Sequence, residues 1–159
     1  MAVDNLVFTR VDDRLIHGQV MTAWLKTYSN AKQILIVDDE TSKDPFMQQM
    51  FSLLVPKGVS ITIQNVDDAT ATLKNGLAEP TVMLVKYPLT IKRLIDNGVD
   101  IDYFNIGGMG MTKGRKKFFQ NISMSDEERQ ICKELTDKGV RIEIQIVPAQ
   151  SMYEVSKLL

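Results

Sequence analysis

The chain has 159 residues, of which 44% are hydrophobic and 25% are charged, and its formal net charge at pH 7 is −1. A chain of this length can bury the core of one ordinary domain, and a near-neutral charge gives no general attraction to nucleic acid or to an anionic membrane. The longest apolar runs have about five residues, whereas a membrane-spanning helix needs roughly 20. We therefore expect one globular domain, residues 1–159, with no nucleic-acid partner.

The chain contains one cysteine, Cys132, and one histidine, His17. A single cysteine cannot form an internal disulfide, and residues 1–5 lack the basic and apolar regions of a secretory signal. These features predict a cytoplasmic protein. One histidine and one cysteine cannot supply the nitrogen and sulfur ligands of a zinc site within a single chain. We therefore expect no structural metal ion.

Apolar segments alternate with helix-length segments along the chain. Strands are predicted at 6–11, 33–37, 59–63, 81–85, 103–106 and 140–147. Between them, helices are predicted from Val20, after Asp44-Pro45, from Pro88 to about Gly98, and from Ser125 to Lys138, where Ser125 and Glu128 have capping-box spacing. Segment 107–125 has weak periodicity, and a short hairpin is expected at 116–122.

This alternation predicts an α/β fold with an open, mainly parallel sheet and helices on both of its faces. Residues 34–37 and 82–85 are apolar throughout, as is typical of central parallel strands covered on both sides. Residues 140–147 alternate strictly between apolar and polar, which predicts a strand near the edge. Ligands of such sheets bind beyond the carboxyl ends of the strands.

Three Val-Asp-Asp triplets, at 11–13, 37–39 and 66–68, end predicted strands. For the second and third, we expect the aspartate to cap the helix that follows, since aspartate is a preferred N-cap. The first triplet differs because Arg14 and His17 follow it closely.

His17 lies at the predicted junction of the first strand and the first helix. The helix N-terminus near Gly18 favours an anion, and the planar fork of Arg14 matches phosphate oxygens. Asp12 or Asp13 either orients Arg14 or the ring, or only caps the helix. This set suits nucleophilic acceptance of a phosphoryl group by neutral imidazole. The alternative, a general base in a hydrolase or isomerase, has no nucleophile partner in the sequence.

Two further motifs have competing interpretations. The glycines of segment 105–110 predict a tight turn with positive φ, or else a backbone that approaches an anion. Segment 33–40 resembles the first strand of a receiver domain, whose acidic pair would be Asp38 and Asp39. That comparison needs an acceptor aspartate where Lys86 stands, so a receiver-like signalling domain is disfavoured.

The run from Arg10 to Val20, RVDDRLIHGQV, strongly resembles the phosphorylation loop of the IIB component of the mannose/fructose/sorbose family of the bacterial phosphoenolpyruvate-dependent sugar phosphotransferase system. The similarity continues at 105–109, 113–115 and 139–148. It departs from the family after Gly-Gly-Met, where the chain continues with 110–113 in place of a polar or aromatic residue and an Arg-Glu pair. The family fold is again an open, mainly parallel sheet with helices on both faces.

The resemblance implies that His17 is a phosphoryl carrier, modified on Nδ1, and that Arg14 binds the phosphate. Asp12, Asp13, Gly18, Gln19, Gly107 and Gly108 are expected to support the phosphate or the loop. The activity implied is that of a transferase of phosphorus-containing groups, a protein-Nπ-phosphohistidine–sugar phosphotransferase that uses no metal and no dissociable cofactor.

The resemblance also implies partners. Phosphate arrives from a separate IIA protein and passes to a sugar that the membrane IIC and IID subunits translocate, which places the chain at the inner face of the cell membrane. A homodimer is expected only from the general frequency of symmetric assemblies. The alternative function is a non-catalytic, phosphorylation-dependent regulator of sugar metabolism. The basic segment 113–117 is either a solvated hairpin tip or a surface for an acidic partner.

Overall fold

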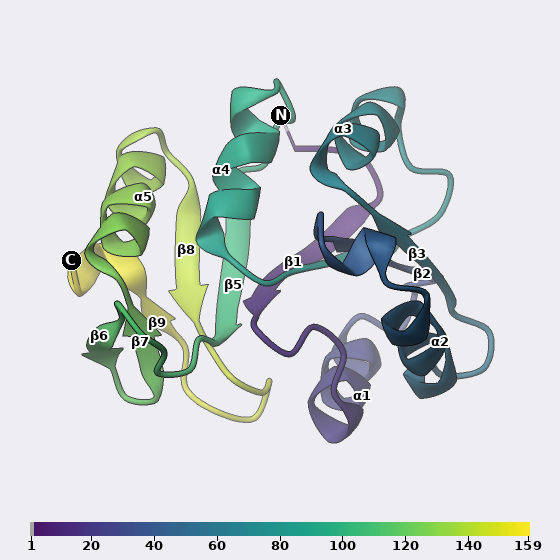
Figure 1. The fold of residues 1–159 in the computed structure, drawn as a ribbon, viewed down its shortest axis with the longest axis horizontal. Coiled ribbons are helices and arrows are strands. Elements are labelled where there is room, and N and C mark those ends of the chain that lie inside the picture. Colours follow the sequence, from purple (N-terminus) through teal and green to yellow (C-terminus); the bar gives the residue numbers. More distant parts are fainter. Residues whose placement is uncertain (1) are drawn as a thin grey trace.

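The computed structural model describes residues 2–159, apart from the side chain of Gln19. It contains a main sheet with helices against it and a separate small hairpin (Figure 1). The strands are β1 (Leu6–Asp12), β2 (Gln33–Val37), β3 (Ser60–Gln64), β4 (Thr81–Val85), β5 (Tyr103–Gly108), β6 (Lys116–Phe119), β7 (Ile122–Met124), β8 (Arg141–Ile144) and β9 (Tyr153–Glu154). The helices are α1 (Gly18–Thr27), α2 (Pro45–Leu54), α3 (Val66–Asn75), α4 (Pro88–Asp96) and α5 (Asp126–Asp137), with 3-10 turns η1 (Thr41–Lys43) and η2 (Val155–Lys157).

The main sheet has seven strands in the order β3-β2-β4-β1-β5-β8-β9. All of its pairings are parallel except that of β8 with the two-residue strand β9. The predicted fold class is therefore confirmed. The first strand lies in the middle of the sheet, between β4 and β5. After β1 the chain crosses to β2 on one side of the sheet, and after the neighbouring β5 it continues to β8 on the other side. Ligands of such sheets bind where neighbouring strands connect in opposite directions.

Two apolar clusters cover the two faces of the sheet. On β2, Ile34 and Ile36 pack with the side of the sheet that carries α1 and α2, whereas Leu35 and Val37 pack with the side that carries α3, α4 and α5. Strand residues alternate between faces, so a strand that is apolar throughout must be covered twice. Cys132 of α5 lies in the second cluster, and burial raises the pKa of its thiol to about 12.

Three local predictions are confirmed by hydrogen bonds or pairing. The Ser125 hydroxyl accepts from the Glu128 N–H, and the Glu128 carboxylate accepts from the Ser125 N–H, so α5 begins with a capping box. Asp44 caps α2, which has Pro45 in its first turn. The expected hairpin consists of β6 and β7, which pair antiparallel.

The predicted capping by the later Val-Asp-Asp triplets is wrong. Val66 begins α3 and does not end a strand, and Asn65 caps that helix by accepting from the Asp68 N–H. In the second triplet, Asp38 accepts from the N–H and hydroxyl of Thr41, at the start of η1, and caps no α-helix. A preferred residue type marks a helix start only when the backbone places it one residue before the first turn.

The last predicted strand is also shorter than expected. β8 ends at Ile144 because the carbonyl of the next residue, Gln145, turns to accept from the side chains of Arg10 and Asn105. β8 lies near the edge of the sheet, as predicted, with only the two-residue strand β9 outside it. Within residues 2–159, no helix is both long and apolar enough to cross a membrane.

Candidate active site

A buried ion pair lies at the carboxyl end of β1. The Arg10 side chain is fully buried, and its guanidinium donates to the Asn105 Oδ1 at 2.8 Å, the Gln145 carbonyl at 3.1 Å and the Asp12 Oδ2 at 3.2 Å. The guanidinium also lies 5.5 Å from the centre of the Trp24 ring, within range of a cation–π contact. A guanidinium without water is stable only when its donors are occupied and its charge is opposed.

Asp12 joins this pair to the loop that follows. Its carboxylate, which is also fully buried, accepts from the Arg14 N–H at 3.0 Å, the Arg14 Nε at 3.2 Å and the Arg14 Nη2 at 3.4 Å. It also contacts the Nε2 of His17 at 3.1 Å. One carboxylate therefore holds both arginines and the imidazole, so it orients the ring and does not cap the helix.

The charges around Asp12 keep it ionised. Burial alone raises the pKa of this carboxyl, but the hydrogen bonds from the backbone and side chain of Arg14 and the charges of Arg10 and Arg14 outweigh burial, so the pKa lies below its ordinary value. Burial lowers the pKa of the Arg10 guanidinium, an effect that Asp12 opposes. An arginine still stays protonated at neutral pH.

This arrangement distinguishes the two nitrogens of the ring. An ionised carboxylate can only accept hydrogen bonds, so the Nε2 facing Asp12 carries the hydrogen. In the neutral ring the lone pair is then on Nδ1, which has no hydrogen-bond partner among the described residues. The His17 side chain is 25% exposed, so this nitrogen belongs to a ring that solvent reaches.

The backbone of the loop places the ring at the start of α1. Leu15 is buried with φ of 57°, a conformation that is uncommon for leucine, and its N–H donates to the Asp12 carbonyl. His17 is the N-cap residue of α1, and its side chain makes no capping bond. Gly18 has φ of 21°, which suits glycine. The side chain of Gln19 lies outside the described residues.

Asp13 has a different set of partners from Asp12. Its carboxylate accepts from the Gly110 N–H at 2.7 Å and from the Arg115 Nη1 at 3.0 Å. The Arg115 side chain, only 6% exposed, also binds Glu128 of α5. Asp13 therefore fixes the loop to the segment after β5 and to the hairpin, and caps no helix.

The glycines at the carboxyl end of β5 are required by the buried ion pair. Neither Gly107 nor Gly108 has a positive φ, and both lie in β5, so the predicted tight turn is wrong. A Cβ at Gly107 would overlap the guanidinium of Arg10, and one at Gly108 would lie 2.6 Å from the Asp12 Oδ1. The two glycines leave room for the two charged groups. The anion that a nearby backbone N–H binds is the carboxylate of Asp13, at Gly110.

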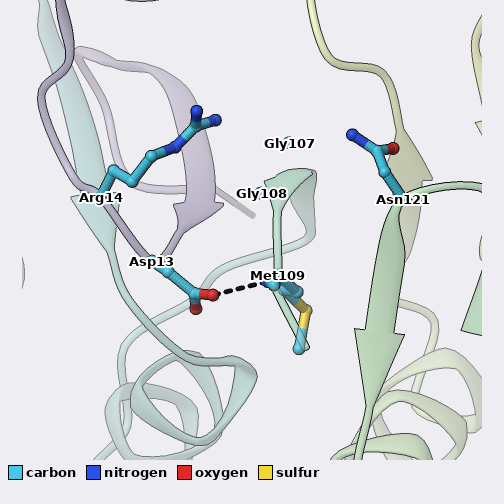
Figure 2. Close-up of a pocket in the computed structure, with 7 residues that line it drawn as sticks. Asp13, Arg14, Gly107, Gly108, Met109 and Asn121 are labelled. Carbon is cyan, nitrogen blue, oxygen red and sulfur yellow. Dashed lines mark hydrogen bonds between the residues drawn. The ribbon is translucent and has the colours of Figure 1, made fainter. Parts of the chain in front are cut away.

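A pocket of about 270 Å³ opens beside the loop and is lined by Asp13, Arg14, Asn121 and segment 107–110 (Figure 2). Arg14 and Asn121 extend from opposite walls, with the glycines between them, and the dashed line marks the bond from Gly110 to Asp13. The Arg14 side chain is 56% exposed.

The sequence interpretation missed four residues of this region: Arg10, Asn105, Arg115 and Asn121. Arg10 was visible only as an arginine within an otherwise apolar strand, which is the signal of a paired buried charge. Arg115 belongs to the basic segment 113–117, in which Lys113, Lys116 and Lys117 are exposed and Arg115 is nearly buried. The segment leads into β6 and does not form the turn of the hairpin, so its placement at a hairpin tip is wrong.

Elsewhere along the same edge of the sheet, the two aspartates of the second triplet form ion pairs with basic side chains. The Lys86 Nζ lies 3.6 Å from Asp38, and Arg93 donates to Asp39 at 2.9 Å. The described residues contain no group of three or more histidine, cysteine or acidic side chains placed to hold a metal ion.

Residues 6–159 match the model of a family described as the PTS system sorbose subfamily IIB component. The sorbose-specific EIIB component of Lacticaseibacillus casei is 33% identical over 144 residues, which are 89% of this chain and 87% of the relative. The fructose-specific EIIB component of Bacillus subtilis is 28% identical, covering 98% of this chain and 96% of the relative. The mannose-specific EIIAB component of Escherichia coli is 29% identical over 94% of this chain, which spans only 47% of that relative.

Solved structures share the fold. The crystal structure of manxB from Thermoanaerobacter tengcongensis is 38% identical with a TM-score of 0.86, and covers 95% of this chain and 92% of its own. The IIBSor domain of the sorbose permease from Klebsiella pneumoniae is 29% identical with a TM-score of 0.88, and covers 99% of this chain and 95% of its own. These matches span nearly the whole chain.

Replacing Gly107 by alanine tests the buried ion pair. The added Cβ must displace the guanidinium of Arg10, so we expect the free energy of unfolding to fall by about 3 kcal/mol. Gly110→Ala is the matched control, because its Cβ would lie at an ordinary 3.7 Å from Asp13. Urea denaturation measures the free energy of unfolding of both variants and of the wild type. Equal stabilities of the two variants would contradict the steric role of Gly107.

The lowered pKa of Asp12 predicts a pH dependence of stability. Because the folded-state pKa lies below the ordinary 3.8, the unfolded chain takes up the proton first as the pH falls. The ion pair therefore contributes fully above that value, and its contribution is lost as the pH drops through the folded-state pKa. Denaturation of the wild type and Asp12→Asn should show a stability difference that shrinks below about pH 4. A difference that stays constant would contradict this.

Proposed function

Because this chain belongs to the sorbose subfamily of IIB components of the sugar phosphotransferase system, we propose that it carries phosphoryl groups on the Nδ1 of His17. The observation that supports this most directly is the contact of the His17 Nε2 with the ionised Asp12. That contact leaves the Nδ1 lone pair available as the nucleophile of the neutral ring.

In this proposal, a phosphohistidine of a IIA protein is the donor. The Nδ1 lone pair attacks phosphorus in line, the nitrogen–phosphorus bond of the donor breaks, and a new one forms on His17. The ring retains its Nε2 hydrogen and gains positive charge, which the carboxylate of Asp12 stabilises. Arg14 is close enough to share this carboxylate and still has free N–H groups for the phosphoryl oxygens.

In the second half-reaction, His17 is the leaving group and no longer the nucleophile. The oxygen of a sugar hydroxyl attacks phosphorus, the bond to Nδ1 breaks, and the electron pair returns to the ring, while the hydroxyl proton leaves to solvent. We propose that the sugar is presented by membrane IIC and IID subunits at the inner face of the membrane. The relatives are named for fructose, mannose, sorbose and N-acetylgalactosamine, so the proposal concerns sugars as a class.

Labelling tests the carrier role. The purified chain is incubated with labelled phosphoenolpyruvate, the general phosphotransferase proteins and a IIA donor. We expect one acid-labile, base-stable phosphate, and its position is unambiguous because the sequence has a single histidine. The label should be absent from His17→Ala. Absence of label from the wild type, or its survival in His17→Ala, would contradict the proposal.

Uptake in cells separates transport from regulation. In a strain that lacks its own IIB component, the wild-type chain should restore sugar uptake and His17→Ala should not. A chain that is labelled on His17 but does not restore uptake would favour the regulator instead.

Replacing Arg14 by lysine tests its role as a phosphate ligand. Lysine keeps the charge but replaces a planar fork by a point donor, so transfer from phospho-IIA should slow by about tenfold. Folding should change little because the side chain is more than half exposed. The matched control is Arg93→Lys, a change in another exposed arginine that pairs with Asp39. Rapid-quench kinetics measure all three proteins, and equal rates would refute the role of Arg14.

A further inference from the structure

Asn121 occupies an unexplained position in the pocket beside the phosphorylation loop. It lies between β6 and β7, in the turn of the hairpin, directly after Gln120, whose φ is 50°. Its side chain is exposed, and its amide makes no hydrogen bond with any described residue. Figure 2 shows the side-chain nitrogen of Asn121 directed into the pocket, toward the wall that carries Arg14.

The hairpin that carries this amide is joined to the segment beside the loop. The Ser123 N–H donates to the Met109 carbonyl at 2.8 Å, which joins the hairpin to the segment after β5. Arg115, at the start of the hairpin, binds both Asp13 and Glu128 with a nearly buried side chain. Asn121 is therefore part of a wall that is joined to the loop at Asp13.

The donors that face the pocket suit an oxyanion. Arg14 uses its Nε and Nη2 on Asp12, and its Nη1 makes no bond with a described residue. The carboxylate of Asp13, the one anion on the walls, is opposed by Arg115 and the Gly110 N–H. What remains unsatisfied is a cationic donor on one wall and a neutral amide donor on the other. Phosphoryl oxygens accept from both kinds of donor.

We propose that Asn121 is a second ligand of the phosphoryl group, opposite Arg14, and that the pocket between them receives the phosphoryl oxygens during transfer. This inference rests on the proposed function, in which His17 carries the phosphoryl group. Arg14 connects the two places, because it binds the carboxylate that orients the ring and also lines the pocket. Two donors on opposite sides can stabilise the charge that spreads over the equatorial oxygens in the transition state.

Two substitutions and one control test this role. Asn121→Ala removes the donor, and the isosteric Asn121→Asp replaces it with an anion. Gln120→Asn is the control, because it changes the neighbouring residue of the same turn to a type that tolerates positive φ and does not line the pocket. The side chain of Asn121 makes no contact that folding needs, so the thermal midpoints of all the variants should match that of the wild type.

The rate of His17 phosphorylation is measured with two donors. Phospho-IIA is the protein donor, and phosphoramidate is a small donor that has no docking surface and releases ammonia when its nitrogen–phosphorus bond breaks. With both donors, we expect Asn121→Ala to be about tenfold slower than wild type, and Asn121→Asp to be about a hundredfold slower. Gln120→Asn should react like the wild type.

Two outcomes would overturn the inference. Rates of both Asn121 variants within twofold of wild type would show that the amide does not contact the phosphoryl group. A loss seen with phospho-IIA but not with phosphoramidate would make Asn121 a docking residue instead. In both cases a labelled wild type keeps the proposed function intact, whereas an unlabelled wild type removes both.

Discussion

The pairing of Arg10 with Asp12 in the middle of the sheet is the interaction on which the rest of this site depends. Both side chains are fully buried, and neither charge would be tolerated there alone. Asn105 and the Gln145 carbonyl accept from the Nη1 of the guanidinium, and the carboxylate also binds Arg14 and contacts His17. The pair therefore connects the sheet to the loop that carries His17.

Several features of the chain follow from this pair. Gly107 and Gly108 must lack side chains because the two charged groups occupy the space above them. β8 must end at Ile144 because the next carbonyl turns toward Arg10. The ring of His17 is held by one nitrogen, so the chemistry proposed for it falls on the other. A buried, hydrogen-bonded polar network restricts its members to one arrangement, and this one sets the orientation of the His17 ring.

The parts of the fold that could be predicted from the sequence are those governed by local rules. The apolar run at 34–37 and the capping box at Ser125 depend on residues close in sequence, and both formed as predicted. The prediction that the Val-Asp-Asp triplets cap helices was wrong because an aspartate can cap a helix, lie in its first turn or accept a hydrogen bond from a residue distant in sequence. Asp39, for example, accepts from the N–H of Val66, 27 residues away. The triplet sequence alone does not indicate which of these three roles the backbone allows.

The sequence by itself determined the α/β class, the strand order along the chain and the motif from Arg10 to Val20, because periodicity and residue type are local properties. Only the tertiary structure decided that Asp12 faces the ring while Asp13 faces Arg115, 102 residues away. It also decided that Gly107 makes room for a guanidinium, and that Asn121 and Arg14 share a pocket. These relations join segments that are distant in sequence, and they exist only once β1, β5 and the hairpin are packed together.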